Sequence, residues 1–384
     1  MRRLQAVLTG ALRAAGPASG AEVLDLGAGQ QLFALRDGIA RPPASLEKLY
    51  TSVALIAKLG PATRFQTAVL GTGSLRPHGV WHGDLYLRGG GDPTFGDETF
   101  NRVWEMGYGP TASELATQLL ARGIRRVTGR VIGDASIFDS LRGGAATGYA
   151  PDIPDMGGQL SALTYDHGSA VPGLSPGAFA ARELALTLRA MHLGAIATPR
   201  TAPTPPGAKL LASVASPPVS VLLRLMNVPS DDLFAELLTK QLGARFAGQG
   251  SIAAGAGVTS SVIAGYGLSP RIDDGSGLAR SDRSSPHQVV ELLKDVWHTP
   301  LGDLLSASLP VVGVEGTVKT IATRTAAQGN CVAKTGTLDN VTNLAGYCHS
   351  QGHHTLAFAL LVDGPPNVRA LPLESRMIAA IARY

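Results

Sequence analysis

The sequence predicts an α+β fold, in which the two ends of the chain build one antiparallel sheet with helices on both faces and a smaller α/β domain is inserted between them. Three observations favour this fold. A chain of 384 residues is too long for one ordinary domain. Strand-like segments occur near both ends, and an amphipathic helix accompanies them at each terminus. We expect a first domain at residues 1–63 and 211–384 and an inserted domain at 64–210.

The N-terminal elements follow from periodicity and turn residues. Leucines at helical spacing within residues 3–15 predict an amphipathic helix instead of a signal peptide, so no export signal is visible in this chain. Residues 21–26 and 31–35 predict two strands joined by a glycine turn. Two prolines at residues 42–43 then end the extended segment. A helix is expected to begin at residues 44–48 and to end before Gly60.

The inserted region is expected to alternate strands with helices. Its last part, residues 197–209, is rich in Pro, Thr and Ala and predicts a linker. The expected strands are 66–70, 84–88 and 130–134, and the expected helices are 113–122 and 179–192.

The C-terminal part is expected to be helical first and to end in a sheet and a helix. Small residues at 248–257 predict a loop. The expected helices are 219–226, 231–242, 286–297 and 371–382, and the expected strands are 331–336, 344–348 and 355–363.

Composition excludes several classes of protein. Hydrophobic residues make up 45% of the chain and charged residues 16%, which is typical of a globular protein. Because the sequence has no apolar run long enough to cross a bilayer, we expect no integral membrane segment. The net charge of +4 is mildly basic and suits an anionic environment such as a cell wall, but without a block of Lys and Arg, nucleic acid is not an expected partner.

The chain has two cysteines, Cys331 and Cys348. Their spacing leaves open both a disulfide and a pair of buried thiols. A turn at residues 339–340 would set an antiparallel register in which Cys331 lies opposite Cys348 and Lys334 lies opposite Ala345. We therefore expect the cysteines to be cross-strand neighbours, and a bond between them would imply an oxidising compartment.

The spacing of Ser45 and Lys48 is typical of nucleophilic catalysis. One helical turn places the hydroxyl and the amine on the same face. A serine is activated by a nearby base, and a desolvated or cation-flanked lysine can lose its proton near neutral pH. The start of a helix also offers backbone N–H groups to a developing oxyanion. Alone, the motif also fits an N-cap serine with a solvated lysine.

A second motif, Lys334-Thr335-Gly336, lies on an expected strand. A cation at the edge of a sheet can bind a substrate carboxylate, and Thr335 adds a hydroxyl donor. Gly336 allows another backbone to approach closely. The triplet occurs once in the chain, and its alternative is an edge-strand lysine beside a turn.

Ser230-Asp231-Asp232 lies between these two motifs. The order Ser-x-x-Lys, Ser-Asp-Asn, Lys-Thr-Gly is typical of active-site serine β-lactamases and penicillin-binding proteins. On these residues the chain resembles the D-Ala-D-Ala carboxypeptidases of penicillin-binding protein 4 type, which are class C low-molecular-mass penicillin-binding proteins of serine peptidase family S13. Further similar segments are 83–93, 159–163, 274–278 and 344–347.

The resemblance implies a penicillin-binding, serine β-lactamase-like transpeptidase fold and an acyl-enzyme mechanism. Ser45 would attack the penultimate D-Ala carbonyl of a peptidoglycan stem peptide, and Lys48 would take its proton. Ser230 would relay a proton to the leaving D-Ala. Lys334 and Thr335 would hold the terminal carboxylate of the substrate.

The resemblance also implies an oxyanion hole formed by the N–H groups of Ser45 and Thr337. β-Lactams would acylate the same serine. No cofactor and no metal are implied, and two histidine pairs at i,i+4 spacing are interpreted as surface residues. The resemblance places the protein outside the cytoplasm, in a periplasm or cell wall.

Two departures from the family pattern weaken part of this interpretation. Asp232 stands where the family has Asn, and a carboxylate can only accept hydrogen bonds where an amide donates them. Its charge would also favour protonated Lys48. In addition, Ser161–Leu163 runs soon into a helix and linker, so a further β-rich domain of the family is expected to be missing from the insertion.

These departures keep two alternatives open. One is a degenerate, non-catalytic member that binds peptidoglycan. The other is a serine β-lactamase or esterase on the same fold. The balance between carboxypeptidase and endopeptidase activity also stays open at this point.

Overall fold

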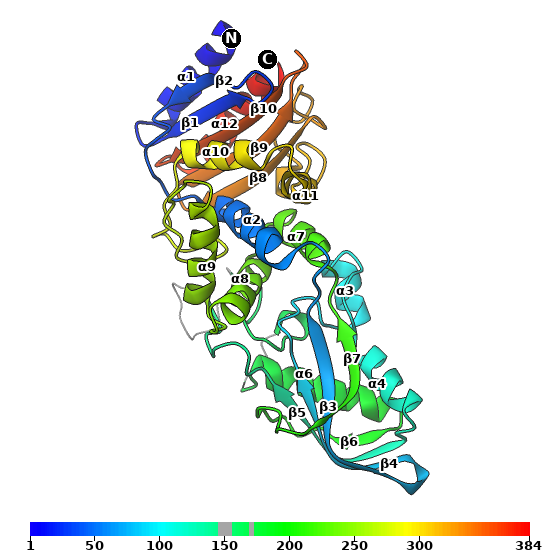
Figure 1. The fold of residues 1–384 in the computed structure, drawn as a ribbon. Coiled ribbons are helices and arrows are strands. Elements are labelled where there is room, and N and C mark those ends of the chain that lie inside the picture. The colour runs from blue at the N-terminus through cyan, green and yellow to red at the C-terminus, as the bar shows by residue number, and fades with distance from the viewer. Residues whose placement is uncertain (145–155, 169–172) are drawn as a thin grey trace. The chain divides into compact units, whose positions relative to one another are not determined.

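The fold is described by a computed structural model over residues 1–144, 156–168 and 173–384. The chain divides into two compact units, and each is described by itself. The first comprises Met1–Pro61, Ser220–Ala235 and Gly255–Tyr384, and the second comprises Ala62–Val219 and Glu236–Ala254 (Figure 1). The expected boundaries assign residues 62–63, 211–219 and 236–254 to the first domain, whereas they group here with the second unit.

The first unit is built on a five-stranded antiparallel sheet with the strand order β2-β1-β10-β9-β8. Gly20 in β1 lies opposite Leu361 in β10, so strands from the two ends of the chain pair directly, as the sequence predicts. The strands are β1 (Gly20–Asp25), β2 (Gln30–Leu35), β8 (Cys331–Leu338), β9 (Val341–His349) and β10 (Thr355–Asp363).

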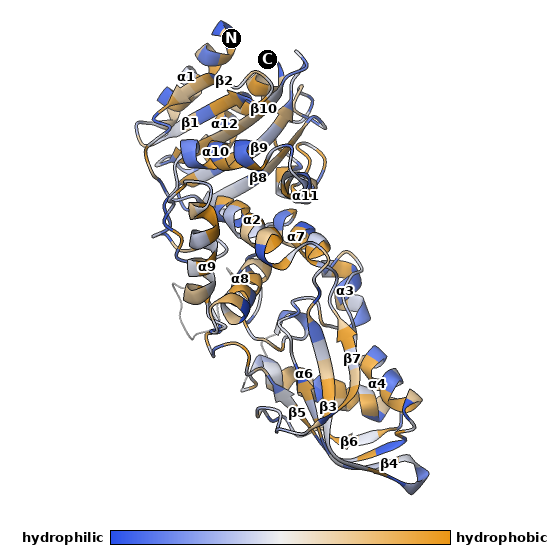
Figure 2. Ribbon diagram, viewed as in Figure 1, coloured by the Kyte–Doolittle hydropathy of each residue, from blue (hydrophilic) through white to orange (hydrophobic). Residues whose placement is uncertain are grey.

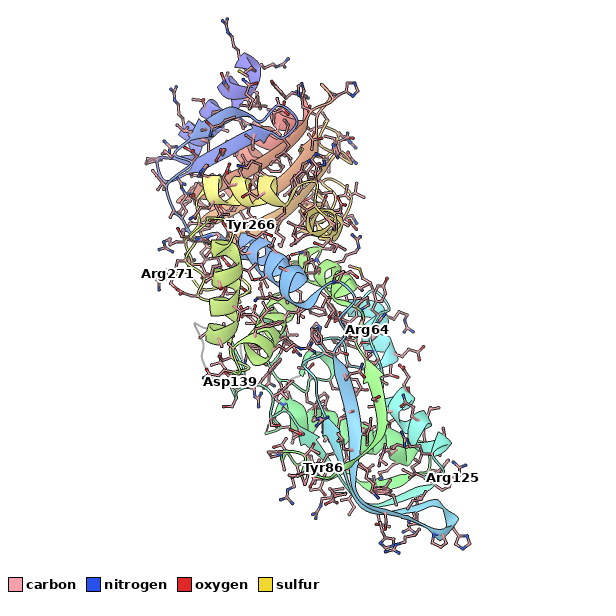
Figure 3. The ribbon with its side chains drawn as sticks, in the orientation of Figure 1. Arg64, Tyr86, Arg125, Asp139, Tyr266 and Arg271 are labelled. Carbon is pink, nitrogen blue, oxygen red and sulfur yellow. A yellow bond between two sulfur atoms is a disulfide. The ribbon has the colours of Figure 1, made fainter. Side chains whose placement is uncertain are left out.

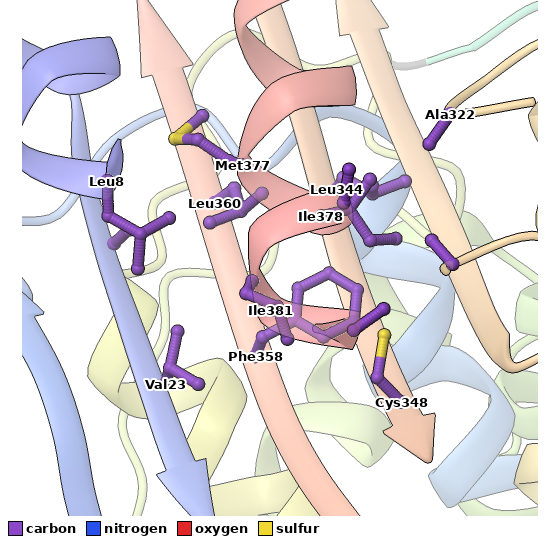
Figure 4. Close-up of a cluster of buried hydrophobic side chains, with 14 of the residues drawn as sticks. Leu8, Val23, Ala322, Leu344, Cys348, Phe358, Leu360, Met377, Ile378 and Ile381 are labelled. Carbon is purple, nitrogen blue, oxygen red and sulfur yellow. The ribbon is translucent and has the colours of Figure 1, made fainter. Parts of the chain in front are cut away.

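Helices cover both faces of this sheet. On one face, α1 (Arg2–Ala15) and α12 (Asn367–Ala382) pack with the sheet in a core that includes Leu8, Phe358 and Ile381 (Figure 4). On the other face lies α10 (Pro286–Val296), which has both hydrophobic and hydrophilic residues along its length (Figure 2). The Tyr347 hydroxyl of β9 donates to the Leu293 carbonyl of α10 at 2.8 Å. The expected arrangement of helices on both faces is confirmed.

The remaining elements of the first unit carry the site described below. Helices α8 and α9 cross the division between the units. The elements are η1 (Ala44–Leu46), α2 (Glu47–Leu59), α7 (Val219–Asn227), α8 (Asp232–Phe246), α9 (Ile252–Ala264), α11 (Pro300–Ser308) and η4 (Gly316–Val318).

Two of these helices differ from the expectation. Residues 248–257 were expected to form a loop, but α9 begins within them at Ile252. Small residues led to the wrong prediction, since alanine is the best helix former and Ile252 and Ile263 are buried. Helix α11 was not predicted, although the Thr299 side chain accepts from Gly302 N at its start, as an N-cap does.

The second unit contains a mixed five-stranded sheet with the order β6-β5-β4-β3-β7. Strand β5 is parallel to its neighbours, and the other pairs are antiparallel. Strand β7 begins at Lys209, where only the end of a linker was expected. The elements are β3 (Gln66–Arg76), η2 (Pro77–Gly79), β4 (Val80–Arg88), α3 (Glu98–Trp104), α4 (Ala112–Ala121), β5 (Arg126–Asp134), η3 (Asp166–Gly168), α6 (Pro176–Ala190), β6 (Gly194–Ile196) and β7 (Lys209–Ala215). In the described part of the chain, every helix is too short or too polar to span a bilayer.

Candidate active site

The turn that carries Ser45 is held tightly against the edge strand of the first sheet. Ser45 lies in η1, and Ala44 before it has a φ of 49°, a left-handed conformation that costs a non-glycine residue about 1 kcal/mol or more. A Cβ atom on Gly336 would lie 2.5 Å from the Pro43 carbonyl oxygen, so only glycine fits in β8 at this point. Asn343 in β9 donates to the same carbonyl at 2.9 Å. The expected close approach at Gly336 is confirmed.

Lys48 is completely buried and surrounded by three hydrogen-bond acceptors. Its Nζ atom donates to Ser45 Oγ at 3.0 Å, to Asp232 Oδ1 at 2.5 Å and to the Ser276 carbonyl oxygen at 2.8 Å. A lysine ammonium has three N–H donors and no acceptor. Because all three donors have a partner and one partner is a carboxylate, this arrangement fits a protonated lysine.

Lys334 is equally buried but has different partners. Its Nζ atom donates to Ser230 Oγ at 2.7 Å and to the Thr335 carbonyl oxygen at 3.0 Å. Burial and the nearby charge of Lys48 lower the pKa of Lys334 well below its usual value, and Asp232 opposes this effect. Ser230 itself has a φ of 66°, so a second left-handed residue stands beside the site.

The hydrogen-bond partners of the two lysines, Ser45, Asp232 and Ser230, line a cavity of about 370 Å³ in the first unit. The Thr335 hydroxyl in its wall donates to Thr317 Oγ1 at 2.8 Å. The cavity is lined by Ser45, Ser230, Asp232, Thr317, Thr320, Ile321, Thr335, Thr337, Leu371 and Glu374. A hydroxyl nucleophile, two buried amines and a set of threonine donors can bind an anionic peptide end and transfer its acyl group.

Comparison with known proteins decides the family. The model of the D-Ala-D-Ala carboxypeptidase 3 (S13) family matches residues 3–178 and 175–383. The chain belongs to this family. It is a serine-type D-Ala-D-Ala carboxypeptidase, as the motifs predict.

Individual relatives agree with this assignment. The D-alanyl-D-alanine carboxypeptidase of Actinomadura sp. (strain R39) is 28% identical over an alignment of 455 residues, which covers 96% of this chain and 82% of the relative. Penicillin-binding protein 4 (dacB) of Haemophilus influenzae superposes with a TM-score of 0.80 at 19% identity, over 98% of this chain and 99% of that one. The Bd3459 endopeptidase of Bdellovibrio bacteriovorus, solved acylated by penicillin G, has a TM-score of 0.53 at 17% identity, over 94% of this chain and 88% of that one. The predicted penicillin-binding fold is confirmed.

In this S13 carboxypeptidase, the structure brings the predicted side chains together. Ser45 contacts Lys48, Lys48 contacts Asp232, and Lys334 contacts Ser230. Thr337 and Thr335 line the same cavity. Sequence reasoning missed five residues of the wall because they lie in segments without a recognised motif: Thr317, Thr320, Ile321, Leu371 and Glu374.

A disulfide joins Cys331 to Cys348 between strands β8 and β9 of the S13 carboxypeptidase. Cys331 lies opposite Cys348 and Lys334 opposite Ala345, so the predicted register is confirmed. The bond lies three positions before Lys334 and fixes the strand that supplies this lysine to its neighbour.

A serine of the second unit matches a different acyl-transfer pattern. Residues 173–177 have the G-x-S-x-G spacing of a hydrolase nucleophile. Ser175 accepts from Ala178 N at 3.4 Å and caps helix α6. Its place at a helix start explains this serine as an N-cap, so Ser45 is the nucleophile candidate of the S13 enzyme.

Proposed function

We propose that this S13 carboxypeptidase removes the terminal D-Ala of peptidoglycan stem peptides through an acyl-enzyme on Ser45. One observation carries the proposal: Ser45 Oγ lies 3.0 Å from a completely buried lysine, on the wall of a cavity that also presents Ser230 and Thr335. A nucleophile, its base and donors for an anionic substrate end are thus in one place.

Acylation begins with a proton transfer at Lys48. The geometry fits a protonated lysine at rest, held by Asp232 Oδ1 at 2.5 Å, so Lys48 must release a proton to solvent before it can act as a base. The neutral amine then takes the Ser45 proton as Oγ forms a bond to the penultimate D-Ala carbonyl carbon. The C–N bond to the terminal D-Ala breaks, and Ser230 relays the proton to the leaving nitrogen. Water hydrolyses the ester by the same steps.

Lys334 and Thr335 supply the binding of the terminal carboxylate. The lowered pKa of Lys334 favours its neutral form in the free enzyme. An arriving carboxylate favours the cation, so the charge is restored when an anionic substrate end is present. The N–H groups of Ser45 and Thr337 form the oxyanion hole in this proposal.

We extend the proposal to β-lactams, which would acylate Ser45, and to the cleavage of cross-linked peptides by the same chemistry. The enzyme would work outside the cytoplasm, which the disulfide supports because such bonds persist in oxidising compartments. Residues 1–63 and 211–384 would be the catalytic domain, and residues 64–210 an insertion shorter than is usual in the family.

Labelling with a fluorescent penicillin tests the nucleophile. We expect wild type to be labelled at Ser45, as mapped by mass spectrometry of the modified peptide, and to release D-Ala from a stem-peptide analogue. Ser45→Ala should lose both signals while keeping its unfolding temperature, because Ser45 borders a cavity. Ser140→Ala, an exposed serine outside the site, is the matched control and should be labelled normally. Labelling of Ser45→Ala would contradict the proposal, and an unlabelled wild type would favour a non-catalytic member.

A further inference from the structure

A loop of the first unit, residues 273–282, packs against Lys48. The Ser276 carbonyl accepts from Lys48 Nζ at 2.8 Å, and the Gly275 carbonyl accepts from the Thr51 hydroxyl at 2.9 Å. Gly277 has a φ of +85°, and a Cβ atom there would lie 1.9 Å from the Ala44 carbonyl oxygen. The loop therefore touches both helix α2 and the turn that carries Ser45, and a shift of the loop would move the acceptor of Lys48.

Asp274 gives this loop its shape. Its carboxylate accepts from the backbone N–H groups of Gly277 and Ala279, each at 2.7 Å. The Ser276 hydroxyl donates to it at 3.4 Å. Asp274 is completely buried, so it is held by donors of the loop alone and not by solvent. The position of the Ser276 carbonyl thus depends on the state of the Asp274 carboxyl group.

A second buried carboxyl group, Asp282, contacts the first. The side chains of Asp274 and Asp282 are hydrogen bonded to one another, and both are completely buried. Asp282 Oδ1 accepts from Asp273 N at 2.7 Å. Asp282 Oδ2 receives no hydrogen bond from a donor in the described residues. This is explained if Oδ2 carries a proton and donates it to Asp274. Two carboxyl groups in hydrogen-bond contact need one proton between them.

Electrostatics agrees with this geometry. Burial and the carboxylate of Asp274 raise the pKa of Asp282 to about 9. Burial also raises the pKa of Asp274, but two backbone N–H donors and the charge of Lys48 oppose this increase. Because Asp274 accepts from two backbone N–H groups while Asp282 Oδ2 has no donor among the described residues, we assign the negative charge to Asp274 and the proton to Asp282.

We propose that Asp274 and Asp282 share one proton and act together as a positioning pair, which holds the Ser276 carbonyl on Lys48 and sets the charge that Lys48 faces. The inference rests on the role proposed for Lys48 as the base. With one proton, the pair contributes one negative charge behind the lysine. Without the shared proton, the two carboxylates repel each other and displace the loop. Their second negative charge also favours the protonated form of Lys48.

Other charged groups lie near the pair, and a test must distinguish their effects on acylation from the effect of the pair. Asp232 contacts Lys48 directly, and the charges of Lys334 and Lys48 act on one another. Glu47 of α2 lies beside Gly277. On the loop itself, Asp273 is partly exposed and forms an ion pair at 3.0 Å with Arg271, which Figure 3 labels. Hydrogen bonds with Ser281 and Arg271 lower the pKa of Asp273, and the charge of the exposed Arg283 lowers it further.

The pH dependence of penicillin acylation tests the pair. The wild-type rate should fall at alkaline pH by up to about tenfold per pH unit as the pair loses its proton, since one ionisation controls the decrease. In Asp282→Asn the amide still donates to Asp274 but cannot ionise. We expect its rate at pH 7 to stay within about threefold of wild type and the alkaline decrease to disappear. Asp273→Asn is the matched control on the same loop and should keep the decrease.

Infrared difference spectra between pH 7 and pH 11 give a second readout that needs no substrate. Wild type and Asp273→Asn should lose the same band of protonated carboxyl groups over this range. Asp282→Asn should lose a smaller band, because buried Glu374, whose pKa is raised to about 8, contributes the rest. A wild type that is never acylated at any pH would contradict the proposed function and leave the infrared result to decide about the pair. An Asp282→Asn enzyme with an unchanged alkaline decrease and an unchanged infrared band would overturn the positioning pair.

Discussion

Lys48 and Lys334 are both completely buried beside one cavity, yet their surroundings prepare them for different charge states. Lys48 has a carboxylate, a carbonyl and a hydroxyl as acceptors, one for each ammonium proton. The two acceptors found for Lys334 are a hydroxyl and a carbonyl, and its pKa is lowered well below the usual value. Burial alone therefore does not decide the charge of a lysine. The acceptors decide it, and above all the presence of a carboxylate in contact.

The comparison assigns different tasks to the two amines. Lys48 holds a proton that it must release before it can act as a base. Lys334 has no carboxylate among its hydrogen-bond acceptors, and the carboxylate of the substrate supplies this counter-charge. A site with both kinds of lysine can couple substrate binding to the start of the chemistry.

Removal of each amine should give the largest difference between them. We expect Lys48→Met to lower the rate of penicillin acylation by about 10³-fold or more, because a positioned general base contributes about 10²–10⁴-fold. Lys334→Met should lower it by about 10²-fold, since it removes binding of the anionic group and the relay partner of Ser230. Stopped-flow fluorescence with a reporter penicillin measures both rates.

A third buried lysine is the control for this experiment. Lys240 in the second unit is paired with Asp139 at 2.6 Å. Lys240→Met should lower the unfolding temperature and leave the acylation rate of the folded protein unchanged. Equal rate losses in Lys48→Met and Lys334→Met would remove the distinction between the two tasks.

Asp232→Asn should make the surroundings of the two lysines more alike. We expect a smaller change in acylation rate than removal of either lysine gives. The substitution removes the carboxylate from Lys48 and restores an amide donor, so we expect acylation at pH 7 to become about 10–100-fold faster, a gain no larger than one oxyanion-hole donor provides. Acylation rates of wild type and of the variant are measured from pH 6 to 10. Asp231→Asn, which keeps an acceptor for Phe234 N, is the matched control. A wild type that is faster than Asp232→Asn at pH 7 would show that Asp232 is an adapted part of the site, as the proton acceptor of Lys48.

The smallest effect concerns the pH dependence of binding at Lys334. The lysine is charged below its lowered pKa and neutral above it, so the affinity for a peptide with a free terminal carboxylate should decrease as pH rises through that value, by up to about tenfold per unit. The same peptide with a terminal amide should show no such decrease. Titration calorimetry with Ser45→Ala, which cannot cleave the peptides, compares the two. Identical pH dependence for both peptides would contradict the role of Lys334.

The three motifs were sufficient to predict the centre of the site. Ser45 and Lys48 are one turn apart, and their contact follows from local geometry that a sequence contains. The register of β8 and β9 also followed from a short turn, so Lys334 opposite Ala345 could be predicted. These are interactions between residues near one another in the chain, or between segments whose pairing the turn dictates.

The surroundings of the motifs were not predictable in the same way. The Asp274–Asp282 contact depends on a loop conformation, and Glu374 reaches the cavity wall because α12 packs on the sheet. Residues 274–278 were noted as a family-like segment, but Asp282 and Glu374 do not differ in sequence from ordinary surface acids. Helix α9 was missed because small residues occur in loops and in packed helices alike, and burial of Ile252 and Ile263 decides between them.

The pairing of β1 with β10 also has a consequence in time. Gly20 lies opposite Leu361, so the central strands of the catalytic sheet leave the ribosome roughly 340 residues apart, which is on the order of 20–70 s at typical rates of synthesis. Until then β1 has no partner on the side of β10. Ser45 is made early, whereas the strand that joins β1 to β9 is made near the end of synthesis. A chain interrupted before β10 therefore contains Ser45 but lacks the strand that joins the two ends of the sheet.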